Sequence, residues 1–396
     1  MTGTMGRTTA AVPGEAVSRA RSWTFDVALP FWHERGLDRV FGGPVEALTP
    51  AGENANAPFK RTRVVARQLY AFSHAAELGW APGEGAADHV WAFFRDRVWQ
   101  GPDSGWPRRL DPAGDRVLDA VPDLYDYAFA LFALGWRYRL SGDADALKMA
   151  HQTLDLVEAR FRHPKGGFLH EIPAPLPRQQ NPHMHLAEAA IVLAEASGEH
   201  RFHALACELA ALFRTRIVRM PSGVLPEFFG DDWSVAPGEA GQTVEPGHQF
   251  EWAWILARHQ AMTSTDNSDL IKALVGFAER HGFDAVSHRV YASVGPDGTP
   301  RDKGTRTWPS TERIKGWIAL NEVTGIPAGD QIAKSIDYLM RTHLAAPAIP
   351  GAWTEYFDAA GQPVTGSVPA STLYHLLLAF AEAMRWSAHP RSGAPA

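Results

Sequence analysis

The chain has 396 residues, of which 45% are hydrophobic and 21% charged, a balance typical of a globular protein with a large buried core. A formal net charge of -6 provides no basic field for nucleic acid or anionic lipid, so neither is expected as a partner. Cys207 is the single cysteine, which excludes a disulfide framework, and no segment reads as a signal peptide or membrane span, so we expect a cytoplasmic protein.

Helical hairpins alternate with short excursions along the chain, at a spacing of about sixty residues. A first helical run covers Val17–Arg35. Pairs of runs with apolar residues at intervals of three and four then follow, such as Arg61–Gly79 and Glu84–Trp99. The excursions combine glycine, aromatic and polar residues and predict β-hairpins at Gly42–Leu48, Ser104–Asp115, Gly166–Ile172, Gly223–Trp233, Tyr291–Pro300 and Gly351–Pro363.

Glycines mark the ends of helices at Gly79, Gly142, Gly198, Gly282 and Gly325. Prolines mark the starts of helices at Pro122, Pro182, Pro246, Pro309 and Pro369. Twelve helices result, and Val17–Arg35 can close a ring with the last, Pro369–Trp386. We therefore predict an all-α (α/α)6 barrel with β-hairpin excursions at one rim. It would be a single domain over residues 16–386, between flexible segments 1–15 and 387–396. An open helical solenoid is the alternative, because its repeats carry the same punctuation.

The helix after each excursion begins with polar or aromatic residues in an otherwise apolar pattern. In a ring these starts share one rim, so their side chains would line one funnel of the kind that binds small ligands. An isolated histidine such as His375 is ordinarily a core residue, but its match in phase with His248 favours a functional role. The residues in phase are Arg63, Tyr125, Asp126, His183, His185, His248, Glu251, Trp308, Glu312 and His375.

A metal site is not expected. His183 and His185 are two residues apart and point in different directions on a helix, unlike a metal-binding pair spaced by four. Asp231 and Asp232 lie in a segment that reads as an exposed turn. HExxH and CxxC motifs do not occur.

Glu227 and Glu355 occupy matching places in the excursions GVLPEFF and GAWTEYF, and each either contacts sugar hydroxyls or caps its turn. Aromatic residues at the same phase are mostly core, but Trp308 suits the apolar face of a pyranose. These aromatic residues are Trp106, Tyr125, Phe228, Trp252, Trp308 and Trp353.

Four segments resemble the N-acylglucosamine 2-epimerase superfamily, which includes mannose isomerase, sulfoquinovose isomerase and cellobiose 2-epimerase. The resemblance covers about Val17 to Trp386 and implies an (α/α)6 barrel with a cofactor-free mechanism on an open-chain sugar. The segments are RQQNPHMHLAEA (Arg178–Ala189), EPGHQFEWAW (Glu245–Trp254), TRTWPSTERIK (Thr305–Lys315) and VPASTLYHLLLA (Val368–Ala379).

The resemblance also implies roles. His248 and His375 would exchange a proton with the sugar, and Glu251 would orient His248. Arg63, in KRTRVVARQLY, would stabilise an enediolate, and His183 would assist ring opening or bind hydroxyls. The expected substrate-binding residues are His183, His185, Asn181, Tyr125, Glu227, Trp308, Glu312, Arg306 and Trp353.

Removal of the C2 proton by a neutral histidine would give a cis-enediol, whose reprotonation at C1 yields a ketose and at C2 an epimer. The segment PGHQFEWAW looks more like mannose isomerases than N-acylglucosamine enzymes, and basic residues beyond Arg63 and Arg306 are not evident at this phase. We therefore expect D-mannose and D-fructose interconversion, with D-lyxose and D-xylulose as a second pair. A 2-epimerase of the mannose/glucose or cellobiose type is the alternative.

Two further readings remain open. A glycoside hydrolase or lyase on the same toroid could use Glu227, Glu251, Glu312 and Glu355 as its acids. A non-catalytic sugar-binding or protein-binding toroid would bind without turnover. Monomer and homodimer are both compatible with the sequence.

Overall fold

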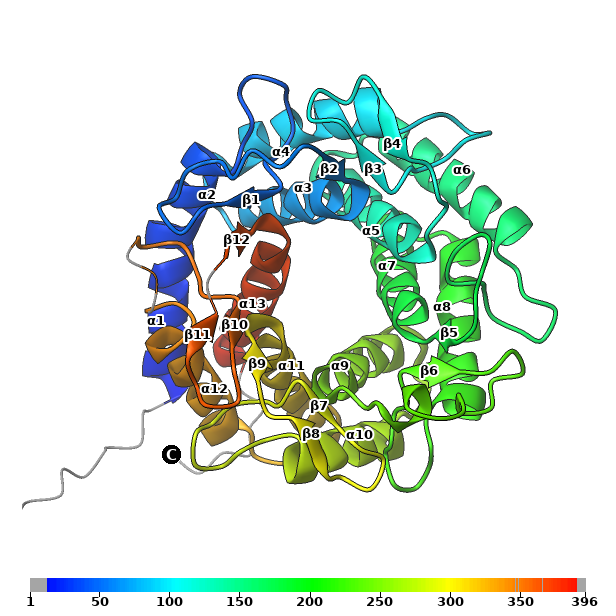
Figure 1. Ribbon diagram of the computed structural model, residues 1–396, viewed down its shortest axis with the longest axis vertical. Helices are drawn as coiled ribbons and strands as arrows, with labels where there is room; N and C mark the ends of the chain where they lie inside the picture. Colours follow the sequence, from blue (N-terminus) through cyan, green and yellow to red (C-terminus); the bar gives the residue numbers. More distant parts are fainter. Residues whose placement is uncertain (1–12, 346, 348, 365, 390–396) are drawn as a thin grey trace, which may run out of the picture.

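The computed structural model describes residues 13–345, 347, 349–364 and 366–389. Two concentric rings of helices surround one axis in Figure 1. The inner ring consists, within the described residues, of α3 (Thr62–Glu77), α5 (Leu124–Ser141), α7 (Asn181–Ser197), α9 (Pro246–Thr263), α11 (Thr307–Thr324) and α13 (Leu373–Ala388). The outer ring consists of α1 (Pro13–Ser22), α2 (Leu29–Arg35), α4 (Gly83–Phe93), α6 (Ala144–Arg160), α8 (His200–Leu212), α10 (Ser268–His281) and α12 (Gly329–Arg341). The predicted (α/α)6 barrel is confirmed.

Short helical turns complete these elements. A π-helical turn joins α1 to α2, so that the two make one outer run, and others extend α4 and α8. A 3-10 turn leads into α13. Their bounds are η1 (Trp23–Ala28), η2 (Phe94–Val98), η3 (Phe213–Ile217), η4 (Ala240–Gln242) and η5 (Ala370–Thr372).

The two rings differ in how the helices are buried. In α7 every residue from Pro182 to Leu193 is buried, because the helix packs on its neighbours, on the outer ring and on the barrel axis. In α12 the buried residues recur at helical spacing along one stripe, from Ile332 to Leu339, and the rest face solvent. Polar residues at the starts of inner helices are therefore enclosed rather than solvated.

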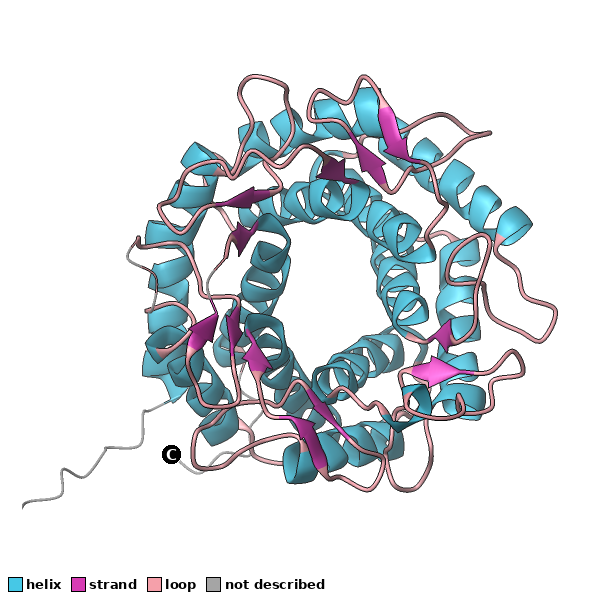
Figure 2. Ribbon diagram, in the orientation of Figure 1, coloured by secondary structure: helices cyan, strands magenta, loops and turns pink. Residues whose placement is uncertain are grey.

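The strands gather with the loops at one end of the barrel, as Figure 2 shows. They are β1 (Ala47–Leu48), β2 (Lys60–Arg61), β3 (Arg109–Leu110), β4 (Val117–Asp119), β5 (Arg178–Gln179), β6 (Phe228–Phe229), β7 (Ser293–Val294), β8 (Pro300–Asp302), β9 (Thr305–Arg306), β10 (Tyr356–Phe357), β11 (Pro363–Val364) and β12 (Val368–Pro369).

Pairing between neighbouring repeats holds all the inner helices at this rim. A residue one to four positions before each inner helix pairs with the loop of the next repeat, and the last repeat pairs with the first. The pairs are Arg61 with Arg109, Asp123 with Glu171, Gln179 with Phe228, Val244 with Val294, Arg306 with Tyr356, and Pro369 with Ala47. Hairpins of two named strands form in the described residues as β3–β4, β7–β8 and β10–β11. The other excursions are tight turns closed by isolated antiparallel bridges, which are Leu37 with Pro44, Arg162 with Phe168, and Arg219 with Val224.

The ring closes through several contacts between the two ends of the chain. Helix α13 packs against α3, and α1 packs against α12 and α13. The Arg19 guanidinium lies 2.6 Å from the carboxylate of Asp337, and β12 pairs with β1. These contacts exclude the open solenoid.

The ends of the barrel differ slightly from the prediction. Helix α1 begins at Pro13, within the segment expected to be flexible, and α13 runs to Ala388. The rest of the two predicted flexible segments, 1–12 and 390–396, lies outside the described residues. Within the described part of the chain, every helix is too short or too polar to span a bilayer.

Gly223 anchors the loop that carries Glu227. Its φ is +77°, a Cβ there would lie 2.1 Å from the Ala273 carbonyl oxygen, and its own carbonyl accepts from the Gln249 amide. Gly223→Ala is expected to lower the free energy of unfolding by about 2–4 kcal/mol, from left-handed strain plus overpacking. Gly198→Ala, with a φ of +72° and open space around it, is the control and should cost about 1 kcal/mol. Equal shifts in thermal melts would contradict the steric explanation.

Candidate active site

A polar cavity of about 280 Å³ lies at the rim where the inner helices begin. All the inner helices or the turns that lead into them contribute to it, so it sits on the barrel axis. It is lined by Arg67, Tyr125, Asn181, His185, Glu245, His248, Glu251, Arg306, Trp308, Glu355, Ser371, Thr372 and His375. Most of the residues expected from the sequence therefore share one cavity.

His248 is held by a carboxylate from the excursion that leads into its own helix, α9. Its Nδ1 lies 2.9 Å from Glu227, which also accepts from the Gln180 amide at 2.9 Å, and 3.8 Å from Glu245. Burial alone would lower the pKa of His248, but the charges of Glu227 and Glu245 raise it to about 10. His248 is therefore an imidazolium at neutral pH, and its orienting carboxylate is Glu227 rather than the expected Glu251.

His375 has the opposite protonation. Its Nδ1 lies 2.8 Å from Glu312, which is fully buried. Burial, with the charges of Arg67 and Lys315, lowers the pKa of His375 well below its usual value. A neutral imidazole must donate from Nδ1 to this carboxylate, which leaves Nε2 as an unprotonated base.

Trp308 contacts both histidines. The centroid of its ring lies 4.9 Å from that of His248 and 5.8 Å from that of His375. Burial raises the pKa values of Glu245 and Glu355, two carboxyls that also line the cavity, to about 7. The cavity thus combines a flat apolar surface with groups that bind hydroxyls.

A buried polar cluster forms the floor. His185 Nδ1 lies 3.1 Å from Glu188, which accepts from the Tyr374 hydroxyl at 2.7 Å. Burial lowers the pKa of His185 to about 4 despite this carboxylate. Glu251 lies 4.0 Å from both His185 Nδ1 and Lys315 Nζ, and burial, with the charge of Glu312, raises its pKa well above the usual value.

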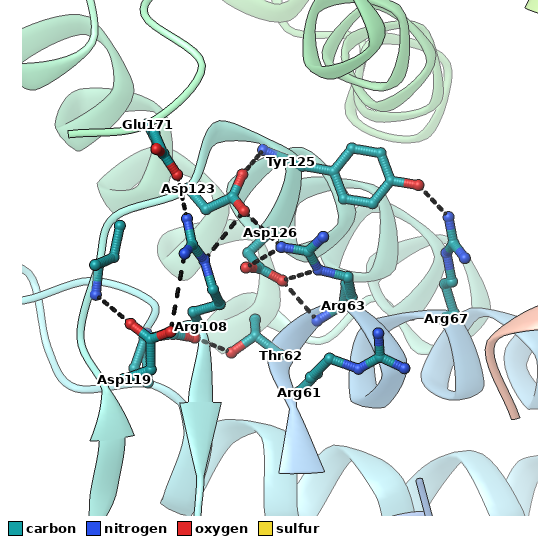
Figure 3. Close-up of polar contacts among 12 residues, drawn as sticks. Arg61, Thr62, Arg63, Arg67, Arg108, Asp119, Asp123, Tyr125, Asp126 and Glu171 are labelled. Atoms are coloured by element: carbon teal, nitrogen blue, oxygen red, sulfur yellow. Dashed lines mark hydrogen bonds and ion pairs between the residues drawn. The ribbon is translucent and has the colours of Figure 1, made fainter. Parts of the chain in front are cut away.

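The arginine of α3 that faces this cavity is Arg67 rather than the expected Arg63, and Arg306 lines the cavity as expected. Figure 3 shows Arg63 enclosed by Asp123 and Asp126, to which it donates at 2.6 to 2.8 Å. Arg63 lines an adjoining cavity of about 330 Å³ but not the cavity that contains the histidines. Arg67, one turn further along α3, lines both cavities and donates to the Tyr125 hydroxyl at 2.6 Å. The spacing of four between these arginines in KRTRVVARQLY was the available signal.

Two of the expected substrate-binding residues, His183 and Trp353, are packed inside the barrel wall and not at the cavity surface. His183 Nε2 accepts from the Phe168 amide at 3.0 Å, and its Nδ1 lies 3.2 Å from the Gln179 carbonyl oxygen. Both nitrogens are thus engaged by backbone, and burial lowers the pKa of His183 to about 3. Trp353 is buried against Trp32, with ring centroids 4.7 Å apart. Neither residue lines the cavity that contains the histidines.

Glu227 and Glu312 lie behind the two histidines and hold them, and Glu227 is absent from the lining of the cavity. Glu355 lines the cavity and accepts from the Thr372 hydroxyl at 2.8 Å. Asp126 pairs with Arg63. Sequence reasoning missed Arg67, Glu245, Gln180, Ser371, Thr372 and Lys315, all of which lie within or next to the motifs it identified.

Among the residues that the structure describes, three groups of side chains have the chemistry to hold a metal ion. They are His185 with Glu188 and Glu251, Glu227 with Glu245 and His248, and Glu251 with Glu312 and His375. Lys315 already provides a fixed cation beside two of these carboxylates, 2.6 Å from Glu312 and 4.0 Å from Glu251. Metal-independent chemistry stays a prediction, which chelation tests below.

Residues 43–379 match the family model described as N-acylglucosamine 2-epimerase (GlcNAc 2-epimerase). The chain belongs to this family. It is 35% identical over 374 residues to a mannose-6-phosphate isomerase of Rhizobium meliloti (strain 1021), a match that covers 91% of this chain and 94% of the relative. It is 26% identical over 315 residues to a cellobiose 2-epimerase of Bacteroides fragilis, which covers 74% and 78%. The crystal structure of a D-mannose isomerase superposes with a TM-score of 0.83 at 21% identity, over 96% of this chain and 100% of that one. These findings identify the protein as a sugar isomerase or epimerase of this family.

Proposed function

We propose that the protein interconverts free D-mannose and D-fructose, and D-lyxose and D-xylulose more slowly, through a cis-enediol. The observation that supports this most is a pair of histidines on one cavity, each with Nδ1 held by a buried carboxylate at 2.8 to 2.9 Å, in surroundings that shift their pKa values in opposite directions. An imidazolium supplies a proton to an oxygen, and a neutral imidazole removes one from carbon, which is what an aldose–ketose isomerisation requires at neutral pH.

The chemistry divides between the two sides of the open-chain sugar. The neutral Nε2 of His375 takes the proton from C2, while His248 donates a proton to the carbonyl oxygen at C1, giving the enediol. The proton on His375 then returns to C1 as His248 recovers a proton from the hydroxyl at C2, which becomes the ketose carbonyl. Arg67 lies where negative charge develops on these oxygens and stabilises it without reorganisation.

Three arginines near the mouth are paired with carboxylates, which supports a neutral sugar over a phosphorylated one, whereas Arg67 and Arg306 line the cavity without an ion pair among the described residues. Arg61 pairs with Glu46, Arg63 with Asp123 and Asp126, and Arg108 with Glu171. A sugar phosphate needs uncompensated cations, because the phosphate must lose part of its hydration shell on binding. A relative named for mannose 6-phosphate makes this a point to test directly.

A 2-epimerase remains the second candidate, because return of the proton to the other face of C2 would use the same histidines. A cellobiose 2-epimerase among the relatives supports it. A glycoside hydrolase is less well supported, because Glu227 and Glu312 are each committed to a histidine. Action on a monosaccharide in the cytoplasm, as a monomer or homodimer, stays a prediction.

The deciding experiment is incubation of EDTA-treated protein with D-mannose in heavy water, with products and deuterium positions followed by NMR. We expect fructose with deuterium at C1, and at least tenfold lower kcat/KM for mannose 6-phosphate. Glucose as the product would indicate the epimerase. Turnover only after metal is added back would contradict the cofactor-free mechanism, and preference for the phosphate would overturn the proposed substrate.

A further inference from the structure

A fully buried lysine, Lys315, lies beside Glu312, the carboxylate that contacts His375. Lys315 has no exposed surface, and its Nζ lies 2.6 Å from Glu312, 4.0 Å from Glu251 and 4.5 Å from the centre of the Trp254 ring. Burial alone would lower the pKa of Lys315, but the carboxylates of Glu312, Glu251 and Glu188 raise it. Its ammonium therefore stays charged in the core.

The position of this charge matters because Glu312 has two possible protonation states. One carboxylate oxygen faces the ammonium, and the other accepts from Nδ1 of His375 at 2.8 Å. If Glu312 were protonated, its hydroxyl would donate to Nδ1 of His375, and the imidazole proton would move to Nε2. Nε2 would then present a donor to the sugar, and the base that removes the C2 proton would be lost.

We propose that Lys315 is a positioning residue for His375: its buried ammonium keeps Glu312 ionised, and the ionised carboxylate keeps the unprotonated nitrogen of His375 directed at the substrate. This inference rests on the proposed function for its kinetic consequence. Its structural consequence, the tautomer of His375, is independent of the substrate.

The surroundings leave Lys315 as the main group that opposes protonation of Glu312. Burial raises the pKa of Glu312, and Lys315 is the first of the groups that lower it. Glu251 carries like charge when ionised and favours the protonated form. Glu312 and Lys315 both lie on α11. The charged and titratable groups packed around them are His248 and Glu251 on α9, His185 and Glu188 on α7, Arg67 on α3, and Tyr374 and His375 on α13.

The test is Lys315→Met, with the pH dependence of kcat as the first readout. An opposite charge this close lowers a carboxyl pKa by about 1–3 units, so its loss should move the acid limb of the profile up by about 1–3 pH units. Activity lost at neutral pH should therefore return as the pH rises, with KM little changed. A uniform fall in kcat at all pH values, or an unshifted limb, would overturn the proposal.

Arg313→Met is the matched control on the same helix. Arg313 is also buried, but it donates to Glu279 on α10, on the outer side of α11, at 2.5 and 2.9 Å. Its loss should lower the melting temperature and leave the acid limb unchanged. A shift of the limb in this control would mean that any buried charge on α11 has the same effect, and would overturn the assignment to Lys315.

A second readout does not depend on turnover. Nitrogen-15 NMR of labelled histidines, with His375 assigned by its loss in His375→Gln, should place the proton on Nδ1 in the unmodified protein and on Nε2 in Lys315→Met near neutral pH. An unchanged tautomer would overturn the proposal. If the unmodified protein converts no sugar, the proposed function fails, while this measurement still decides the role of Lys315.

A double variant covers the case in which Lys315→Met does not fold. Lys315→Met/Glu312→Gln removes both members of the closest ion pair and so avoids the uncompensated Glu312 charge that Lys315→Met leaves, and it should fold. If Lys315 acts through Glu312, its kcat should match that of Glu312→Gln alone within about twofold. A further tenfold loss would show that Lys315 acts through another group and would overturn the proposal.

Discussion

Replacement of His375 by glutamine should lower kcat for D-mannose by about 10²–10⁴-fold, the usual contribution of a positioned acid or base. The reason is that Nε2 of His375 is the unprotonated nitrogen in a pair whose other member, His248, is already protonated. KM should change little, because Arg67, Trp308 and Glu355 remain to bind the sugar. Steady-state kinetics and the rate of deuterium exchange at C2 both measure the effect.

His183→Gln is the control for this substitution. His183 lies in the same family motifs and is equally buried, but both of its ring nitrogens bond to backbone. Its replacement should lower the melting temperature while the folded protein keeps its kcat. Turnover by His375→Gln within tenfold of the unmodified enzyme would show that another group removes the proton.

The second large effect concerns the acid. Glu227→Gln removes the charge 2.9 Å from His248 Nδ1, whose pKa is raised to about 10 mainly by that carboxylate. In the unmodified enzyme the imidazolium persists through neutral pH, and activity should fall as the pH rises through about 10. Without the carboxylate, burial lowers the pKa of His248, so the alkaline limb should move down by at least about one unit.

The measurement is kcat against pH for both proteins. Glu199→Gln is the control, because Glu199 pairs with His151 in the outer ring at 2.9 Å and its loss should not move either limb. An alkaline limb that stays in place in Glu227→Gln would mean that His248 is not the acid. A loss that is equal at every pH would assign Glu227 to packing alone.

The arginine pair on α3 shows a feature that the local sequence does not predict, namely which of two arginines faces the cavity. The motif KRTRVVARQLY places Arg63 and Arg67 on one face of a helix that starts at the rim, but only Arg63 is expected in the funnel. Which of them has a free guanidinium depends on Asp123 and Asp126, which belong to the next repeat and enclose Arg63. Arg63 is therefore neutralised, and Arg67, which is deeper in the barrel, lines the cavity that contains the histidines.

The sequence by itself determined the six helical hairpins and the rim at which the candidate site lies, whereas closure of the ring was decided by contacts between the two ends of the chain. Glycines and prolines at helix ends and the helical periodicity are local signals of a repeat that occurs six times along the chain. The matching positions of His248 and His375 within that repeat can be recognised without knowledge of tertiary contacts. Only the tertiary structure decided which carboxylate serves which histidine. Glu227 reaches His248 because β6 pairs with β5 across repeats, and Glu312 reaches His375 because α11 packs on α13. The protonation of each histidine follows from those partners and from burial, and neither is encoded in the spacing of residues along one helix.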